Sequence, residues 1–152
     1  MKPSDRLRLV VDLKKNQERK ALAALGASQK KLFAAQSQLE HLQQYRREYS
    51  EQYQRLSERS VGLEQLLAFR AFIDKLDQAI AAQMRTVERE QRDAETKRRF
   101  WENAHHHGKN LQKLYDKALD NEQRQLDQLE QQEMDDRASR AARNNGNGTT
   151  SA

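Results

Sequence analysis

The scarcity of helix-breaking residues constrains this chain more than any other feature. Pro3 is the only proline, and between it and Asn144 the only glycines are Gly26, Gly62 and Gly108. Proline is excluded from a helix interior, and glycine costs about 1 kcal/mol there relative to alanine. About 140 consecutive positions are therefore free to form long helices.

The composition agrees with long helices rather than with a compact enzyme. Alanine, glutamate, lysine, leucine and arginine account for 77 of the 152 residues, a share typical of coiled coils. Leucine, isoleucine, valine and phenylalanine number only 28, too few to offset the conformational entropy of a layered globular fold. Because 28 basic residues nearly balance 23 acidic ones, disorder is also disfavoured. Composition alone leaves a coiled coil or a disordered chain, and the seven-residue periodicity described below favours an all-α coiled coil.

The point where the chain reverses is predicted near residue 60. The segment 57–62 combines two serines with a β-branched residue and a glycine, between two strongly periodic segments. The predicted organisation is a single antiparallel coiled-coil domain over 1–143, with a helix at 5–58, a turn at 58–62 and a helix at 62–143, followed by a disordered tail at 144–152.

Seven-residue repeats mark the side of each helix that faces the other. In the first arm the a positions are Val11, Glu18, Leu25, Leu32, Leu39, Arg46 and Tyr53, and the d positions are Leu7, Lys14, Ala21, Ser28, Ala35, Leu42, Tyr49 and Leu56. In the second arm the a positions are Leu66, Ile73, Ile80, Val87, Ala94, Trp101, Gly108 and Tyr115, and the d positions are Phe69, Leu76, Gln83, Glu90, Lys97, Ala104, Leu111 and Ala118. Beyond Leu114 the apolar stripe continues in a shifted phase at Leu119, Leu126, Leu129 and Met134, which we interpret either as a stutter or as a helix that runs past its partner.

The two predicted helices differ in length, so part of the second has no partner within the hairpin. Pairing around residue 60 gives partners whose numbers sum to about 121, which places residue 5 opposite about residue 116. The last two dozen or so helical residues are then free to bind another protein.

Two sets of side chains share one spacing and meet across the predicted hairpin. Residues spaced 4, 3 and 4 apart lie on one helical face, and such sets are Gln38, Leu42, Tyr45 and Tyr49 in the first arm and Phe72, Leu76, Ala79 and Gln83 in the second. The d positions Leu42, Tyr49, Leu76 and Gln83 help to close the seam, and the g positions Gln38, Tyr45, Phe72 and Ala79 flank it. Hairpin packing alone could explain the stripe, but exposed aromatic side chains on a charged helix pair are typical of a docking surface.

The chain carries no signal for catalysis or cofactor binding. It has no cysteine and no G-x-x-x-x-G-K-[ST], G-x-G-x-x-G or G-x-S-x-G motif. Three consecutive histidines, His105 to His107, point in three directions on a helix and make a poor metal site. The basic excess of the first 60 residues consists of scattered doublets, unlike the basic region of a DNA-binding zipper. We expect a non-enzymatic protein with no cofactor, metal, nucleic acid or small-molecule substrate.

Over about residues 5–143 the chain resembles the FliJ family of the bacterial flagellar type III export apparatus. The resemblance rests on overall length, on a first helix that ends near residue 58, and on the segments QLEHLQQYRREY at 38–49 and FIDKLDQAI at 72–80. It implies an antiparallel two-helix coiled coil similar to the central stalk subunit of rotary ATP synthases.

The resemblance also implies partners and a location. The free ends would enter the pore of the hexameric flagellar export ATPase ring and promote its assembly and turnover. The stripe would bind the cytoplasmic domain of the membrane export gate, and unloaded export chaperones would bind as well. The implied gate-binding residues are Gln38, Leu42, Tyr45, Tyr49, Phe72, Leu76, Ala79 and, where the family also accepts histidine, Gln83.

The expected location is cytoplasmic, with peripheral association at the cytoplasmic face of the inner membrane at the flagellar base. The longest uncharged runs are under half of the roughly 20 residues that a spanning helix needs, and the first residues are too charged for a signal peptide. Two alternatives stay open at this point: the stalk protein of an injectisome type III secretion system, and a structural coiled-coil spacer without an ATPase partner.

Overall fold

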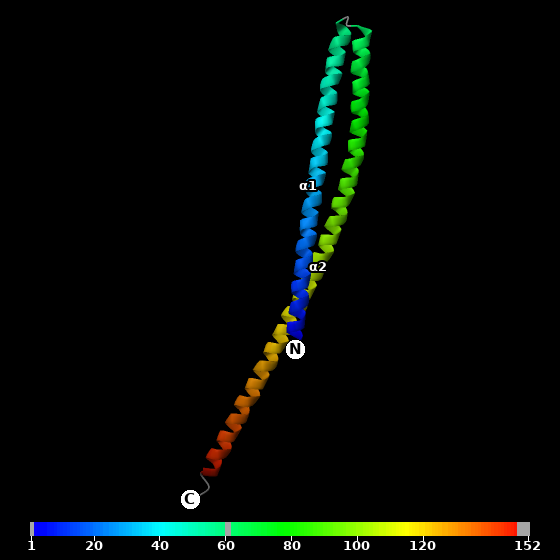
Figure 1. Cartoon of the computed structure of the whole chain (residues 1–152). Helices are drawn as coiled ribbons and strands as arrows, with labels where there is room; N and C mark the ends of the chain where they lie inside the picture. Colours follow the sequence, from blue (N-terminus) through cyan, green and yellow to red (C-terminus); the bar gives the residue numbers. More distant parts are fainter. Residues whose placement is uncertain (1, 60–61, 149–152) are drawn as a thin grey trace. The chain divides into compact units, whose positions relative to one another are not determined.

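The chain folds as two long helices joined by a short connection. The computed structural model describes residues 2–59 and 62–148, with α1 at Pro3–Glu58 and α2 at Leu63–Gly148 (Figure 1). The prediction of an all-α helical hairpin with its turn near residue 60 is confirmed. Within the turn expected at 58–62, Ser60 and Val61 lie outside the described residues.

The helices extend beyond the bounds expected from the sequence. α1 begins at Pro3 rather than at residue 5, since proline fits the first helical position, where its missing N–H needs no partner. α2 continues to Gly148 rather than ending at 143, so the tail predicted at 144–152 is wrong for 144–148. This segment holds asparagines and glycines, which each weaken a helix by about 1 kcal/mol or less, but it holds no proline to block one.

Both helices pass without interruption through the interior glycines, Gly26 and Gly108. The chain divides into two compact units: a turn unit, Gln17–His105, and a terminal unit, Met1–Asn16 with His106–Ala152. The single-domain organisation expected from the sequence stays a prediction. Within the described residues 2–59 and 62–148, no helix has a stretch long and apolar enough to cross a membrane.

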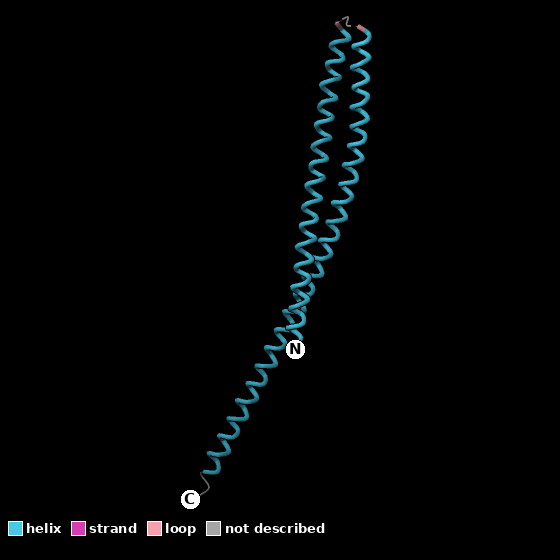
Figure 2. The backbone as a smooth tube through the Cα atoms, viewed as in Figure 1, coloured by secondary structure: helices cyan, strands magenta, loops and turns pink. Residues whose placement is uncertain are grey.

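In the turn unit, α1 and α2 lie side by side and antiparallel (Figure 2). The a and d residues that the sequence assigns there are all buried or half-buried, as predicted. The most deeply buried ones are Ala21, Leu25, Ser28, Ala35, Leu76 and Ala94. Most of these side chains are small, which allows the two backbones to approach closely, and the Ser28 hydroxyl is satisfied by donating to the Leu25 carbonyl oxygen (3.0 Å).

In the terminal unit, the pairing differs from the expected register. The backbone N–H of Ser4 donates to Oε1 of Glu122 (3.2 Å), and its hydroxyl donates to Oε2 (2.7 Å). Residue 4 therefore pairs with residue 122, whereas the sequence placed residue 5 opposite about residue 116. The carboxylate of Glu122 accepts from an N–H that has no partner in the first turn of α1, where the helix dipole also favours a negative charge.

Of the two interpretations of the apolar residues beyond Leu114, the terminal unit contradicts the stutter and agrees with a helix that runs past its partner. The a series continues in unchanged phase from Tyr115 to Glu122, and both are half-buried. The leucines that suggested a phase shift face solvent instead: Leu119, Leu126 and Leu129 are 42%, 48% and 57% exposed. Glu122 interrupts the apolar pattern of the a series. It is tolerated at this half-buried position because the N-terminus of α1 supplies its hydrogen bonds.

Candidate functional site

The eight residues of the predicted stripe separate into two groups by burial. Those assigned to the seam are buried or half-buried: Leu42, Tyr49, Leu76 and Gln83. Those assigned to its flank are all exposed: Gln38, Tyr45, Phe72 and Ala79. The heptad assignment thus gives each of the eight its correct environment, and the exposed flank is available for contact with another molecule.

Ring contacts bring the two arms of the stripe together. Tyr49 of α1 lies between two rings of α2, with centroid distances of 4.5 Å to Phe72 and 6.0 Å to Phe69. Tilted pairs at such distances are attractive beyond the area that they bury. The Tyr49 and Phe72 pair also fulfils the predicted register. Phe72 is 42% exposed, so it both supports the seam and presents part of its ring to solvent.

On α1, a shallow groove of about 470 Å³ adjoins this pair. Three of the stripe residues line it, Gln38, Leu42 and Tyr45, together with His41, Gln44 and Glu48. Tyr45 is 56% exposed, so its ring forms part of an open surface. An exposed aromatic ring beside an apolar side chain and several amide groups can anchor a partner protein.

Gln83, the last residue of the stripe, has a structural role within the hairpin. Its side-chain amide donates to the backbone carbonyl oxygen of Ala35 across the seam (2.9 Å). A half-buried amide with such a bond contributes to the pairing of α1 and α2, so substitution of Gln83 would affect the hairpin as well as any partner.

An ion pair lies beside the stripe, between a seam position of α1 and a flanking position of α2. Nε of Arg46 donates to Oδ1 of Asp77 (2.6 Å), and Nη2 donates to Oδ2 (3.5 Å). This hydrogen bond, with the attraction of the carboxylate, raises the pKa of Arg46. Sequence analysis placed Arg46 in the seam without a partner. The sequence feature that could have predicted this ion pair is Asp77, because it is an acidic residue at an e position of α2 and e residues flank the seam.

A second charged seam residue of α1 is partnered in the same way. Nδ1 of His105 donates to Oε1 of Glu18 (2.6 Å), and the His105 ring stacks on Trp101 with centroids 5.2 Å apart. One member of the histidine run thus belongs to the hairpin contact. Among the residues that the structure describes, no group of three histidine, cysteine or acidic side chains is placed to hold a metal ion.

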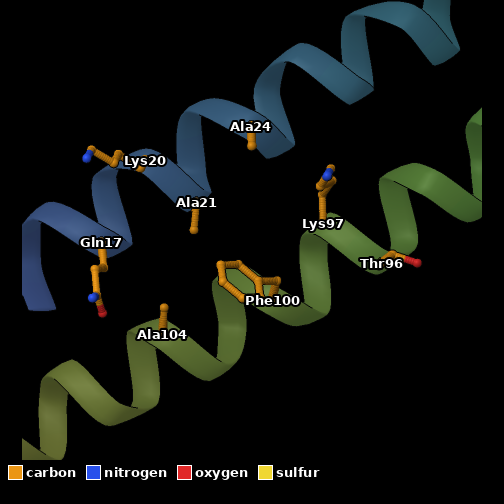
Figure 3. A pocket seen from close by; sticks show the side chains of 8 residues that line it. All are labelled: Gln17, Lys20, Ala21, Ala24, Thr96, Lys97, Phe100 and Ala104. Carbon is orange, nitrogen blue, oxygen red and sulfur yellow. The ribbon is translucent and has the colours of Figure 1, made fainter.

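A further apolar groove, which sequence analysis missed, lies between α1 and α2 in the turn unit. It has a volume of about 560 Å³ and is lined by Gln17, Lys20, Ala21, Ala24, Thr96, Lys97, Phe100 and Ala104. Figure 3 shows the Phe100 ring across from the side chain of Ala21, with Ala104 on the next turn of α2. Phe100 is 66% exposed. The available signal was its spacing, four heptads after Phe72 in the same g series.

The C-terminal part of α2 is exposed throughout. From Gln123 to Asn145 every side chain is exposed, and this segment is called the overhang below. The part from Asp127 to Asp136 contains five carboxylates and no basic residue. Leu126, Leu129 and Met134 interrupt this charged surface and are 48%, 57% and 65% exposed. The overhang begins about six residues later than the sequence predicted, because pairing extends to Glu122.

Comparison with known proteins gives a family for this helix pair. No curated protein and no solved structure matches the chain. A family model described as flagellar FliJ protein matches residues 2–147, nearly the whole chain. The chain therefore belongs to the flagellar FliJ protein family.

Proposed function

We propose that this chain is a non-enzymatic stalk and coupling component of flagellar type III protein export, which binds both the export ATPase ring and the membrane export gate. Membership of the flagellar FliJ family identifies it with the flagellar export system and favours that system over an injectisome. The observation that carries the gate-binding part is the exposed flank of the stripe, since aromatic side chains left outside a two-helix seam are strong candidates for interface anchors.

In this proposal, the stripe binds the cytoplasmic domain of the export gate. Tyr45, with more than half of its surface exposed, acts as the main anchor, and Phe72 contributes the exposed part of its ring. Leu76 and Tyr49 support the flank from the seam. Association of the protein with the cytoplasmic face of the inner membrane follows from gate binding. The overhang enters the pore of the ATPase ring, and export chaperones bind the same protein.

The gate-binding role is tested by comparing two variants with the unmodified chain in a direct binding assay. Calorimetry with the purified cytoplasmic domain of the export gate should give at least about tenfold weaker binding for Tyr45→Ala, as expected for a central aromatic anchor. The matched control is Phe33→Ala, which removes an aromatic side chain that is 73% exposed on α1 outside the stripe and should bind as the unmodified chain does. If Tyr45→Ala binds normally while its helicity is unchanged, the stripe is not the docking surface.

The ATPase-binding role is tested with the purified export ATPase. Addition of the full chain should increase both turnover and ring formation. If neither changes, the chain is better described as a structural coiled-coil spacer, which is the second class of function that its sequence allows.

A further inference from the structure

We propose that the chain self-associates, with the acidic segment 127–136 in the overhang of one copy bound in the Phe100 groove of a second copy. This inference uses only the charge, burial and shape of the two surfaces and does not rest on the proposed function. It assigns an occupant to the groove, which no part of the stalk function uses.

The groove has the chemistry to receive an acidic amphipathic helix. Its floor is apolar, formed by Phe100 with Ala21, Ala24 and Ala104 (Figure 3). Lys20 and Lys97 provide its charge, and the eight lining residues, all within the described part of the chain, include no aspartate or glutamate. A suitable partner therefore combines large apolar side chains with neighbouring carboxylates.

The overhang has the complementary chemistry. Its apolar side chains Leu126, Leu129 and Met134 lie within about 140° of one another around the helix, at 100° per residue. Five carboxylates accompany them between Asp127 and Asp136, a segment that contains no basic residue and is flanked by Arg124 and Arg137. Leucine side chains can fill the space around the Phe100 ring, while the carboxylates approach the two lysines.

The proposed occupant of the groove is the overhang of a second copy of the chain. Because every copy carries both surfaces, a two-fold dimer contains the contact twice and leaves neither surface open, whereas a single contact would leave both ends free to add further copies.

Sedimentation equilibrium of the full chain over a range of concentrations tests the proposal. A dimer should form, and its dissociation constant should rise as salt is added, because screening weakens the attraction between lysines and carboxylates. Phe100→Ala should weaken the dimer at least about tenfold. The matched control, Phe33→Ala, removes a phenylalanine of similar exposure from outside the groove and should leave dimerisation unchanged. A chain that stays monomeric at about 1 mM, or a Phe100→Ala variant that dimerises normally, overturns the proposal.

Charge reversal with rescue tests the identity of the two surfaces. The groove variant K20E/K97E and the overhang variant E130K/E133K should each dimerise more weakly than the unmodified chain. A chain carrying all four substitutions should recover the dimer, because attraction is restored with the signs exchanged. Circular dichroism checks that each variant remains helical. Failure of the combined variant to recover, with helicity intact, contradicts the pairing of these surfaces.

The cysteine-free sequence permits a direct location of the contact. Gln17→Cys introduces a single thiol at the exposed edge of the groove, to which a benzophenone is attached. After irradiation of a mixture of ¹⁵N-labelled and unlabelled chains, mass spectrometry should find crosslinks from this thiol to residues 123–143 of a differently labelled copy. Crosslinks only within one chain, or only to other segments, would overturn the assignment.

Discussion

Two leucines three residues apart on α1 provide a sharp comparison of seam and surface. Leu25 occupies an a position and is 7% exposed, whereas Leu22 is 51% exposed at a flanking position. Both belong to the turn unit. Replacing each with alanine removes the same atoms from the same helix and slightly improves helix propensity in both cases. A difference in stability between the two variants therefore reports burial.

The expected magnitude follows from the burial of Leu25. Full burial of a leucine side chain contributes about 1.5–3 kcal/mol, and Leu→Ala substitutions in cores cost about 2–5 kcal/mol. A two-helix seam can relax around the lost atoms and admits water, so we expect a value near the lower end, about 2–3 kcal/mol, for Leu25→Ala. Leu22→Ala should change the free energy of unfolding by no more than about 0.5 kcal/mol.

Urea unfolding followed by fluorescence measures both values. Trp101 is the only tryptophan and is half-buried in the turn unit, so its emission reports separation of the helices there. With a denaturant slope of about 2 kcal/mol per molar, Leu25→Ala should lower the urea midpoint by about 1–1.5 M, and Leu22→Ala by less than about 0.3 M. Equal shifts for the two variants, or a larger one for Leu22→Ala, would refute the assignment of the seam.

Three further substitutions test individual contacts. Gly26→Ala should stabilise the turn unit by about 0.5–1 kcal/mol in the same urea assay. The reason is that α1 continues as a helix through this position and a Cβ there would meet nothing within 4 Å. Destabilisation by this substitution would contradict that expectation. Gln83→Ala should destabilise the hairpin by about 1 kcal/mol through loss of its bond to the Ala35 carbonyl, and an unchanged midpoint would show that the bond contributes nothing. The hydroxyl of Ser4 is the main cause of the lowered pKa of Glu122, so Ser4→Ala should raise that pKa toward its ordinary value in an NMR titration of the carboxyl carbon. Since the pKa is lowered by folding, the stabilisation from Glu122 is present above the ordinary carboxyl pKa and is lost as the pH falls through the lowered value. The protection factors of the amides at the start of α1, which compare exchange with the intrinsic rate at the same pH, should therefore fall in acid, and less so in Ser4→Ala.

Much of the turn unit is predictable from sequence because its information is periodic. The seven-residue spacing alone assigns the side chains that face the partner helix, and the position of the turn then fixes the register. The contact between Tyr49 and Phe72 is one result of these two steps. The same two steps also predict correctly that Leu76 is buried and that Tyr45 is exposed.

The contacts that sequence analysis missed are those in which a charged residue occupies the seam. Glu18, Arg46 and Glu122 read as interruptions of an apolar pattern, because periodicity carries no information about a partner on the other helix. Each is satisfied by a residue far away in the chain: His105, Asp77 and Ser4. At Glu122 this led to the stutter, which was one of the two interpretations of the sequence, and to an overhang that was predicted to begin too early.

The groove beside the exposed Phe100 was not predicted from the sequence for a different reason. Its g position follows from the same repeat that gives Phe72 its place, but Phe100 lies far from the turn, and apolar residues are most frequent near the turn. A flanking residue lines a groove only where small residues lie opposite it, as Ala21 and Ala24 lie opposite Phe100. Predicting such a groove therefore requires knowing which residues of α1 and α2 face each other.

The charged seam residues also act against misalignment. If α2 slid along α1 by one heptad, the position now held by Asp77 opposite Arg46 would be taken by Arg70 in one direction and by Met84 in the other. Either displacement would leave Arg46 unpaired, and the first would place two guanidinium groups together. Alanine and serine layers are nearly interchangeable along a seam, so apolar packing alone discriminates poorly between such alignments. A polar residue at an a position can specify one register at some expense of stability. In this chain the pairing of Arg46 with Asp77 favours one alignment of α1 and α2. That alignment fixes the positions of Tyr45 and Phe72, which belong to different helices, relative to each other along the helix pair.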